Sequence, residues 1–141
     1  MIAQDLKYVL LAKVPKGVST SLIFDISALV QMIRNSEDFA EVSISVITLI
    51  EVLRWIENEQ KRLKSNALIE EAFEVLDVDK EVALAYLKLH FELKKRDKIV
   101  SDADALIAAT AHARNETLST LDKDFQKFEP VVKVKLLASS K

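Results

Sequence analysis

The chain has 141 residues with 20 basic and 22 acidic side chains, and its formal charge is −2 at pH 7. This length fits one domain with one hydrophobic core. Half of the residues are hydrophobic, whereas glycine occurs once and proline twice, which excludes a disordered or linker-rich chain. Because there is no cysteine and only two histidines, any metal ion here must be held by oxygen.

The charge balance and the apolar pattern limit the partners. An acidic chain offers no general surface for nucleic acid, so contact with RNA or DNA must be local or pass through a metal ion. No apolar stretch approaches the ~20 residues that span a bilayer. Residues 1–14 include Asp5 and Lys7 and lack the layout of a signal peptide. We therefore expect a cytoplasmic protein that does not enter a membrane.

The chain divides into a short extension, residues 1–19, and one continuous domain, residues 20–141. In the extension, apolar residues at helical spacing predict a short helix over 6–14, which Pro15 and Gly17 end. The domain begins with a predicted strand at 21–25 and a helix at 27–34.

A second strand is predicted at 42–45. It is followed by one long helix from Val46 to Gln60, with Leu49, Ile50 and Leu53 on its inner face. The remaining predicted elements are a helix at 66–71, a strand at 73–78, a helix at 79–95, a helix from Ser101 to Arg114, a strand at 117–120, a helix at 123–127 and a strand at 131–136.

Strands that alternate with helices predict an α/β fold, a three-layer α/β/α sandwich with a mostly parallel central sheet. In such sheets function gathers at the carboxyl ends of the strands. Acidic residues stand there or at the adjoining helix starts: Asp25, Glu51, Asp102, Asp104, Asp122 and Asp124. Clustered carboxylates repel one another and raise their pKa values unless a divalent cation is present. The pattern fits an oxygen-ligated Mg²⁺ or Mn²⁺ site.

Each acid also has a purely structural interpretation. Asp25 can be the N-cap of the helix that follows it. Asp104 lies three residues after Ser101, as in a capping pattern, and Asp102 there favours the helix dipole. Glu51 lies among apolar residues and needs a partner or a metal, and Arg54 is the alternative partner.

Asp122 and Asp124 can likewise be turn and cap residues. The basic residues that follow Glu51, and the basic run at 94–98, are either contacts for RNA or solvated helix faces. Trp55 and Tyr86 offer rings that stack on bases, but isolated aromatic residues in such helices more often belong to the core. His90 and His112 are interpreted as ordinary helix residues.

Four segments together resemble a known family. Residues 22–29 form an apolar strand that ends in Asp and is followed by a small hydroxyl residue, which is similar to the first motif of PIN domains. Residues 47–53, 104–111 and 118–125 resemble the second, third and fourth motifs in order and spacing. Residues 1–19 depart from the pattern by preceding its first strand. Trp55 stands where PIN domains frequently have a glycine, and Leu121 stands where they often have a polar or basic residue.

The resemblance implies a PIN-like nuclease domain with the activity of VapC toxins, a metal-dependent endoribonuclease that leaves a 5′-phosphate and a 3′-hydroxyl. It assigns Asp25, Glu51, Asp104 and Asp122 as Mg²⁺ or Mn²⁺ ligands, with Ser27 and Thr120 as supporting hydroxyls. Asp102 and Asp124 are additional candidate ligands. It also implies an RNA substrate, a homodimer and a small antitoxin partner. The alternative is a catalytically silent PIN-like module that binds a partner protein.

Overall fold

Five short parallel strands form the centre of the computed structural model, which describes residues 22–36 and 42–139. The sheet order is β3-β2-β1-β4-β5. The strands are β1 (Leu22–Phe24), β2 (Val42–Ser45), β3 (Glu74–Leu76), β4 (Thr117–Thr120) and β5 (Val134–Leu136). The predicted fold class is confirmed. The two edge strands, β3 and β5, are shorter than the sequence pattern predicts.

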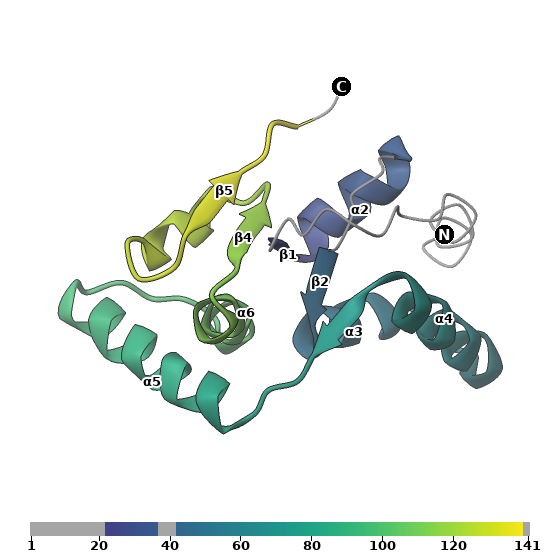
Figure 1. The fold of residues 1–141 in the computed structure, drawn as a ribbon, viewed down its shortest axis with the longest axis horizontal. Coiled ribbons are helices and arrows are strands. Elements are labelled where there is room, and N and C mark those ends of the chain that lie inside the picture. The colour runs from purple at the N-terminus through teal and green to yellow at the C-terminus, as the bar shows by residue number, and fades with distance from the viewer. Residues whose placement is uncertain (1–21, 37–41, 140–141) are drawn as a thin grey trace.

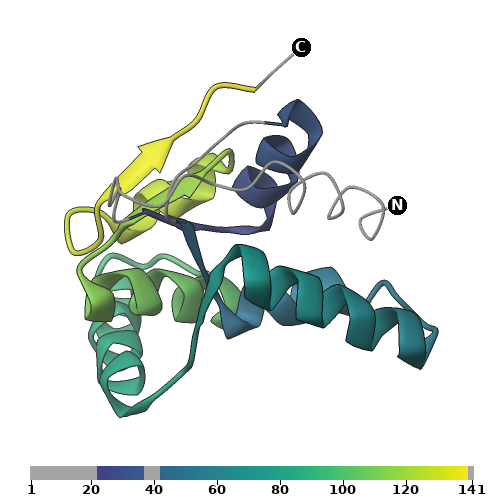
Figure 2. The same cartoon turned by 45° about the vertical axis from the view of Figure 1, so that its right-hand side comes forward.

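Helices cover both faces of this sheet. They are α2 (Ile26–Asn35), α3 (Val46–Leu53), α4 (Glu59–Ala72), α5 (Lys80–Lys95), α6 (Asp102–Arg114) and the 3₁₀ helix η1 (Lys123–Phe128). Helices α5 and α6 pack against each other, and α4 extends away on the opposite flank of the molecule (Figure 1). The turned view keeps this arrangement, with α2 above α4 and apart from α5 (Figure 2).

The alternation of strand side chains divides the core into two clusters. Ile23 and Leu118 are fully buried against α5, α6 and η1. Phe24 and Ile44 point to the other face and are buried against α2, α3 and α4. Since neighbouring residues of a strand face opposite sides, one strand contributes to both clusters, as a sheet covered on two faces requires.

The largest difference between the predicted and the observed elements concerns residues 46–60, which do not form one helix. Helix α3 ends at Leu53, and α4 starts at Glu59 with the side chain of Asn58 accepting from the backbone N–H of Lys61. The Arg62 guanidinium donates to the carbonyls of Ile56 and Glu57, which lie in the segment between the two helices. Residues 66–71 are part of α4.

This break also changes the inner face that the pattern predicts. Ile50 is 55% exposed and Trp55 is 69% exposed, so neither belongs to the core. Thr48 and Val52 are the buried residues of α3 instead. The predicted extension 1–19, with its helix at 6–14, lies outside the described residues. Within the described ranges, no helix is long and apolar enough to cross a membrane.

Candidate active site

The strand order places the candidate site at the switch point of the sheet. From β1 the chain moves outward through β2 and β3, and it then returns to pair β4 with the other side of β1. The carboxyl ends of β1 and β4 therefore lie side by side, and ligands of such sheets bind at this point. Asp25 follows β1 directly, and Thr120 is the last residue of β4.

Asp25 is 4% exposed, and hydrogen bonds hold both of its carboxylate oxygens. Its Oδ1 accepts from the Ser27 hydroxyl at 2.7 Å and from the Ala28 N–H at 2.9 Å. Its Oδ2 accepts from the Thr120 hydroxyl at 2.6 Å. The bond to Ala28 makes Asp25 the N-cap of α2, so the structural interpretation of this residue is correct. The bonds from Ser27 and Thr120 go further, because they fix the orientation of the whole carboxylate.

The two supporting hydroxyls also link this carboxylate to the loop after β4. The N–H of Leu121 donates to the Ser27 hydroxyl at 2.9 Å, and the N–H of Asp122 donates to the Thr120 hydroxyl at 3.0 Å. Asp122 accepts in turn from the N–H of Asp124 at 2.9 Å and caps η1. The backbone that carries Asp122 is thereby tied to Asp25.

Asp104 stands in the first turn of α6, where its N–H donates to the Ser101 hydroxyl at 3.1 Å. Burial raises the pKa of Asp104, the charges of Asp122, Asp25 and Asp124 raise it further, and Ser101 opposes this. Burial is also the largest cause of the raised pKa of Asp25, to which the charge of Asp122 adds, whereas its three hydrogen bonds lower it. These carboxylates therefore lie within one another's electrostatic field.

Glu51 on α3 belongs to the same field. Burial raises its pKa most, followed by the charge of Asp104, while Arg54 lowers it and Asp25 raises it. Its Oε1 atom is buried without a hydrogen-bond partner among the residues that the structure describes. The predicted mutual repulsion is present at Asp25, Glu51 and Asp104, but the loss of hydration on burial is the larger cause.

Arg54, the alternative partner of Glu51, makes no ion pair with it in the described part of the chain. Its guanidinium carbon lies 5.4 Å from the centre of the exposed Trp55 ring. The positive charge stays near Glu51 and lowers its pKa, but the carboxylate keeps an unpartnered oxygen. Burying a carboxylate oxygen without a hydrogen-bond partner costs free energy. Such an oxygen is typical of a position that binds a ligand.

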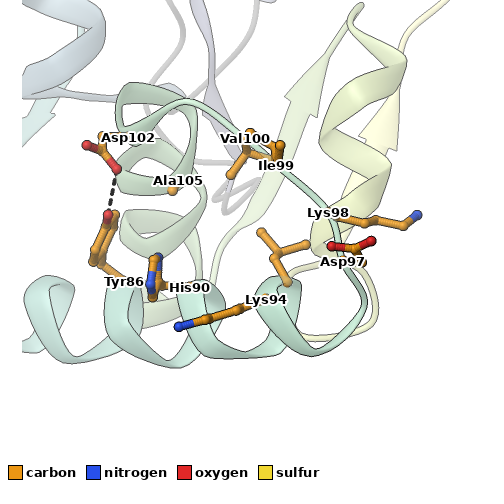
Figure 3. A pocket seen from close by; sticks show the side chains of 10 residues that line it. Tyr86, His90, Lys94, Asp97, Lys98, Ile99, Val100, Asp102 and Ala105 are labelled. Carbon is orange, nitrogen blue, oxygen red and sulfur yellow. Dashed lines mark hydrogen bonds between the residues drawn. The ribbon is translucent and has the colours of Figure 1, made fainter.

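Asp102 does not join the other acids. The Tyr86 hydroxyl of α5 donates to its Oδ1 atom at 2.6 Å, as the dashed line in Figure 3 shows. Residues two positions apart on a helix face different directions, which separates Asp102 from Asp104. No sequence signal indicates this bond, because it depends on how α5 packs against α6.

The carboxylate oxygens of this site decide whether it can hold a divalent cation. Among the described residues, no three Asp, Glu or His side chains already form a group that could hold a metal ion. Mg²⁺ is usually held by one or two carboxylates and keeps several waters, so it does not need a closed cage. Glu51 and Asp104 fit such an ion: each has a raised pKa, the charge of Asp104 acts on Glu51, and Glu51 has an unpartnered oxygen.

Comparison with known proteins gives a family match and two similar ribonucleases. Residues 23–129 match the PIN domain. Ribonuclease VapC1 of Methanocaldococcus jannaschii is 33% identical over 106 residues, which are 74% of this chain and 77% of that protein. Ribonuclease VapC1 of Rickettsia felis is 31% identical in an alignment 121 positions long, which covers 77% of this chain and 90% of that protein.

Solved structures confirm the fold. VapBC2 from Rickettsia felis bound to a promoter DNA fragment matches with a TM-score of 0.68 at 21% identity, over 83% of this chain and 98% of that one. VapBC-1 from nontypeable Haemophilus influenzae matches with a TM-score of 0.67 at 19% identity, over 82% and 96%. With the matched motifs and the acids at the switch point, these comparisons show that the chain belongs to the PIN-domain family.

Proposed function

We propose that this protein is a metal-dependent endoribonuclease of the cytoplasm and the toxin of a toxin–antitoxin pair. The observation that carries the proposal is the buried Asp25, oriented by Ser27 and Thr120 within the field of Asp104 and Asp122. The two VapC ribonucleases at 33% and 31% identity support RNA as the substrate. The site residues we assign are Asp25, Glu51, Asp104 and Asp122. Asp124 is an additional candidate ligand at the edge of this site, and Asp102 is not assigned to it.

The chemistry follows from what these residues are able to do. Mg²⁺ or Mn²⁺ bound by the carboxylates would lower the pKa of a water, aim it and neutralise charge on the phosphate. The hydroxyls of Ser27 and Thr120 keep Asp25 in one orientation, so no rotamer search precedes the reaction. Both hydroxyls are engaged in hydrogen bonds and the chain lacks cysteine, so water is the nucleophile.

The proposed reaction is the hydrolysis of a phosphodiester bond. Water forms the new bond to phosphorus, the bond from phosphorus to the 3′ oxygen breaks, and a proton reaches that oxygen. The products are a 5′-phosphate and a 3′-hydroxyl. Glu51, whose Oε1 has no hydrogen-bond partner among the described residues, would hold the metal ion together with Asp104.

The catalytically silent alternative explains these carboxylates less well. One buried acid, Asp25, and two half-buried acids, Glu51 and Asp104, have raised pKa values and cost stability near neutral pH. Acidic residues with raised pKa values are typical of an active site, where unfavourable electrostatic interactions are retained for function.

The deciding experiment measures cleavage of a single-stranded RNA by the full chain with Mn²⁺, Mg²⁺ or EDTA, together with thermal unfolding of the same preparations. We expect cleavage with the metal ions, none with EDTA, and a loss of cleavage in a folded Asp25→Asn variant. Asp77→Asn, at an exposed position, is the matched control and should cut at the parental rate. Cleavage that survives EDTA, or a folded Asp25→Asn variant with parental activity, would contradict the proposal.

We also propose a homodimer and a small antitoxin that offers an arginine to the carboxylates. The solved neighbours are described as VapBC complexes, which supports an antitoxin partner. Solution scattering at high micromolar concentration measures the assembly, and a monomer there would exclude the dimer. Deletion of residues 6–14 shows whether the extension contributes to either interface.

A further inference from the structure

A second concave site adjoins the N-terminus of α6, where Asp102 lines it. It is a pocket of about 270 Å³ between α5 and α6, and the connecting segment 96–101 closes its side (Figure 3). Tyr86, His90 and Lys94 follow one another at four-residue spacing on α5, which places them on one stripe of the helix. Asp102 and Ala105 of α6 form the opposite wall. We name these five residues the α5/α6 pocket.

The wall on α5 presents aromatic rings. The Tyr86 and His90 rings are stacked with their centres 6.0 Å apart and an angle of 19° between their planes. Phe91 and His90 meet edge to face, with their ring centres 5.2 Å apart. Tyr86 is half-buried and His90 is exposed, so neither ring is consumed by the hydrophobic core. Exposed stacked rings are what protein surfaces offer to nucleobases.

The polar groups of the pocket are placed around these rings. Tyr86 donates to Oδ1 of Asp102, which holds the carboxylate at the edge of the ring pair. Lys94 extends past His90 and supplies a positive charge, whereas the Lys98 ammonium points away (Figure 3). Asp97 also lines the pocket, on the connecting segment beside Lys98. The aromatic wall with Asp102 and Lys94 beside it suits a ligand that is planar, donates hydrogen bonds at its edge and carries a phosphate.

The pocket is preformed because the segment 96–101 is tied down at both sides. The Arg96 guanidinium donates to the carbonyl of Lys127 at 2.6 Å, and the Lys127 ammonium donates to the carbonyl of Ile99 at 3.2 Å. The N–H of Lys98 closes the end of α5 on the carbonyl of Leu93 at 2.9 Å. A site that exists before its ligand arrives loses less entropy on binding.

We propose that the α5/α6 pocket binds one guanine base of the RNA substrate, stacked on Tyr86 and His90, with Asp102 accepting from the base edge and Lys94 contacting a phosphate. This inference rests on the ribonuclease function proposed above and adds a specificity subsite to it. The pocket is slightly smaller than the about 300–1,000 Å³ of small-molecule sites, which suits a single base.

Guanine is favoured by the chemistry of Asp102. A carboxylate only accepts hydrogen bonds, and guanine presents two adjacent N–H donors on its Watson–Crick edge. Adenine and cytosine place an unprotonated ring nitrogen beside their amino group, and uracil places its single N–H between two carbonyls. Each of those arrangements turns an acceptor toward the carboxylate.

The position of the pocket connects it to the cleavage site. Asp102 and Asp104 are two residues apart at the start of α6, and a helix with its side chains is about 10–12 Å wide. The RNA between the two sites would therefore pass over the N-terminus of α6, where backbone N–H groups and the helix dipole favour phosphate. A guanine in the pocket thus sets which phosphodiester reaches Asp104.

The test uses the full-length Asp25→Asn variant with Mg²⁺ and a single-stranded oligouridine that contains one 6-thioguanosine, whose N–H edge is that of guanine. After irradiation and trypsin digestion, the cross-link should lie in peptide 81–88 or 89–94. His90→Ala should raise the Kd about five- to a hundredfold, the range for a lost base–aromatic stack. Replacing the guanosine by inosine should weaken binding, and a Tyr86→Phe variant should lose this discrimination while retaining the stack.

A salt titration separates the phosphate contact from a structural effect. Lys94→Gln should reduce the slope of log K against log salt by about 0.7, the value for one contact to a single strand. Lys95→Gln, the exposed neighbour that does not line the pocket, is the matched control and should leave the slope unchanged.

The outcomes separate the two proposals. Cross-links confined to other segments, or unchanged binding by His90→Ala, would overturn the guanine subsite and leave the ribonuclease proposal intact. Protection of the pocket peptides by the antitoxin but not by RNA would also overturn it. If the unmodified chain neither cuts nor binds RNA, both proposals fail.

Discussion

The Thr120 hydroxyl donates to Asp25 at 2.6 Å although 95 residues separate the two in the sequence. The contact joins the ends of the two neighbouring strands β1 and β4 and lowers the pKa of a carboxyl group whose burial raises it. Because the same hydroxyl accepts from the N–H of Asp122, it sets the positions of two of the proposed metal ligands.

Thr120→Val should therefore damage the site while retaining the shape of the strand. Without the hydroxyl, the pKa of Asp25 rises further, so the acidic limb of the pH–cleavage profile should move to higher pH. The apparent affinity for Mn²⁺ should fall about 10- to 100-fold, as it does when a group that orients a metal ligand is removed. Thr117→Val, at the other end of β4, is the control. An unmoved acidic limb would show that Thr120 has no positioning role.

Neutralising Glu51 should stabilise the metal-free protein. Its folded pKa is raised, so between the ordinary value of 4.5 and the folded value only the unfolded chain ionises, and the free energy of unfolding falls as pH rises through that window. Glu51→Gln removes this loss. We expect its Tm at pH 7 in EDTA to exceed the parental Tm, with the difference shrinking near about pH 4.

The matched control for this stability measurement is Glu57→Gln, an exposed position beyond the end of α3. It should leave Tm and cleavage near the parental values, whereas Glu51→Gln should lose cleavage. A Glu51→Gln variant that is less stable than the parent at pH 7 would mean that the carboxylate has a stabilising partner.

The metal dependence should itself depend on pH. Carboxylate ligands must be deprotonated, and the pKa values of Asp25, Glu51 and Asp104 are raised, so Mn²⁺ affinity should fall already at mildly acidic pH. At a free Mn²⁺ concentration one hundred times the Kd, binding should stabilise the folded chain by about 2.7 kcal/mol. Calorimetric titrations and melting curves at several pH values measure both effects. A Tm that does not respond to Mn²⁺ at neutral pH would argue against the site.

The carboxylates should act as one unit rather than as independent contributors. Asp25→Asn and Asp104→Asn should each reduce cleavage by about 10²–10³-fold, and the double variant should lose little more. A loss in the double variant equal to the product of the single losses would show separate roles. Rates are to be measured only on variants whose thermal unfolding shows them to be folded, since loss of a cap alone costs about 0.5–2 kcal/mol.

Local signals predicted the fold where the stabilising contacts are local. Strand β4 occupies the predicted residues 117–120, and Ser101 caps α6 as its side chain and position indicate. The break between α3 and α4 could not be predicted from apolar spacing, because it is closed by Arg62, whose guanidinium returns to carbonyls five and six residues earlier. A period of 3.6 residues carries no information about such a side chain.

The same distinction applies to the site. The sequence places Asp25, Glu51, Asp104 and Asp122 at strand ends and helix starts, and the structure brings Asp25, Asp104 and Asp122 into one field with Glu51 beside them. Asp102 fits the sequence pattern equally well, but its Oδ1 atom accepts from the Tyr86 hydroxyl and it lines the pocket between α5 and α6. Which of two neighbouring acids joins a site depends on helix rotation and packing between helices, and both are properties of the folded chain.

The sheet order β3-β2-β1-β4-β5 also bears on when the protein becomes active during its synthesis. Strand β1 is synthesised before its neighbour β4, which follows about 90 residues later, and ribosomes add about 5–20 residues per second. Until β4 emerges, β1 lacks this neighbour and Asp25 lacks the hydroxyl that orients it. A nascent or prematurely released chain that ends before Thr117 therefore cannot assemble the site, so the enzyme gains the ability to cut RNA only after β4 has been synthesised.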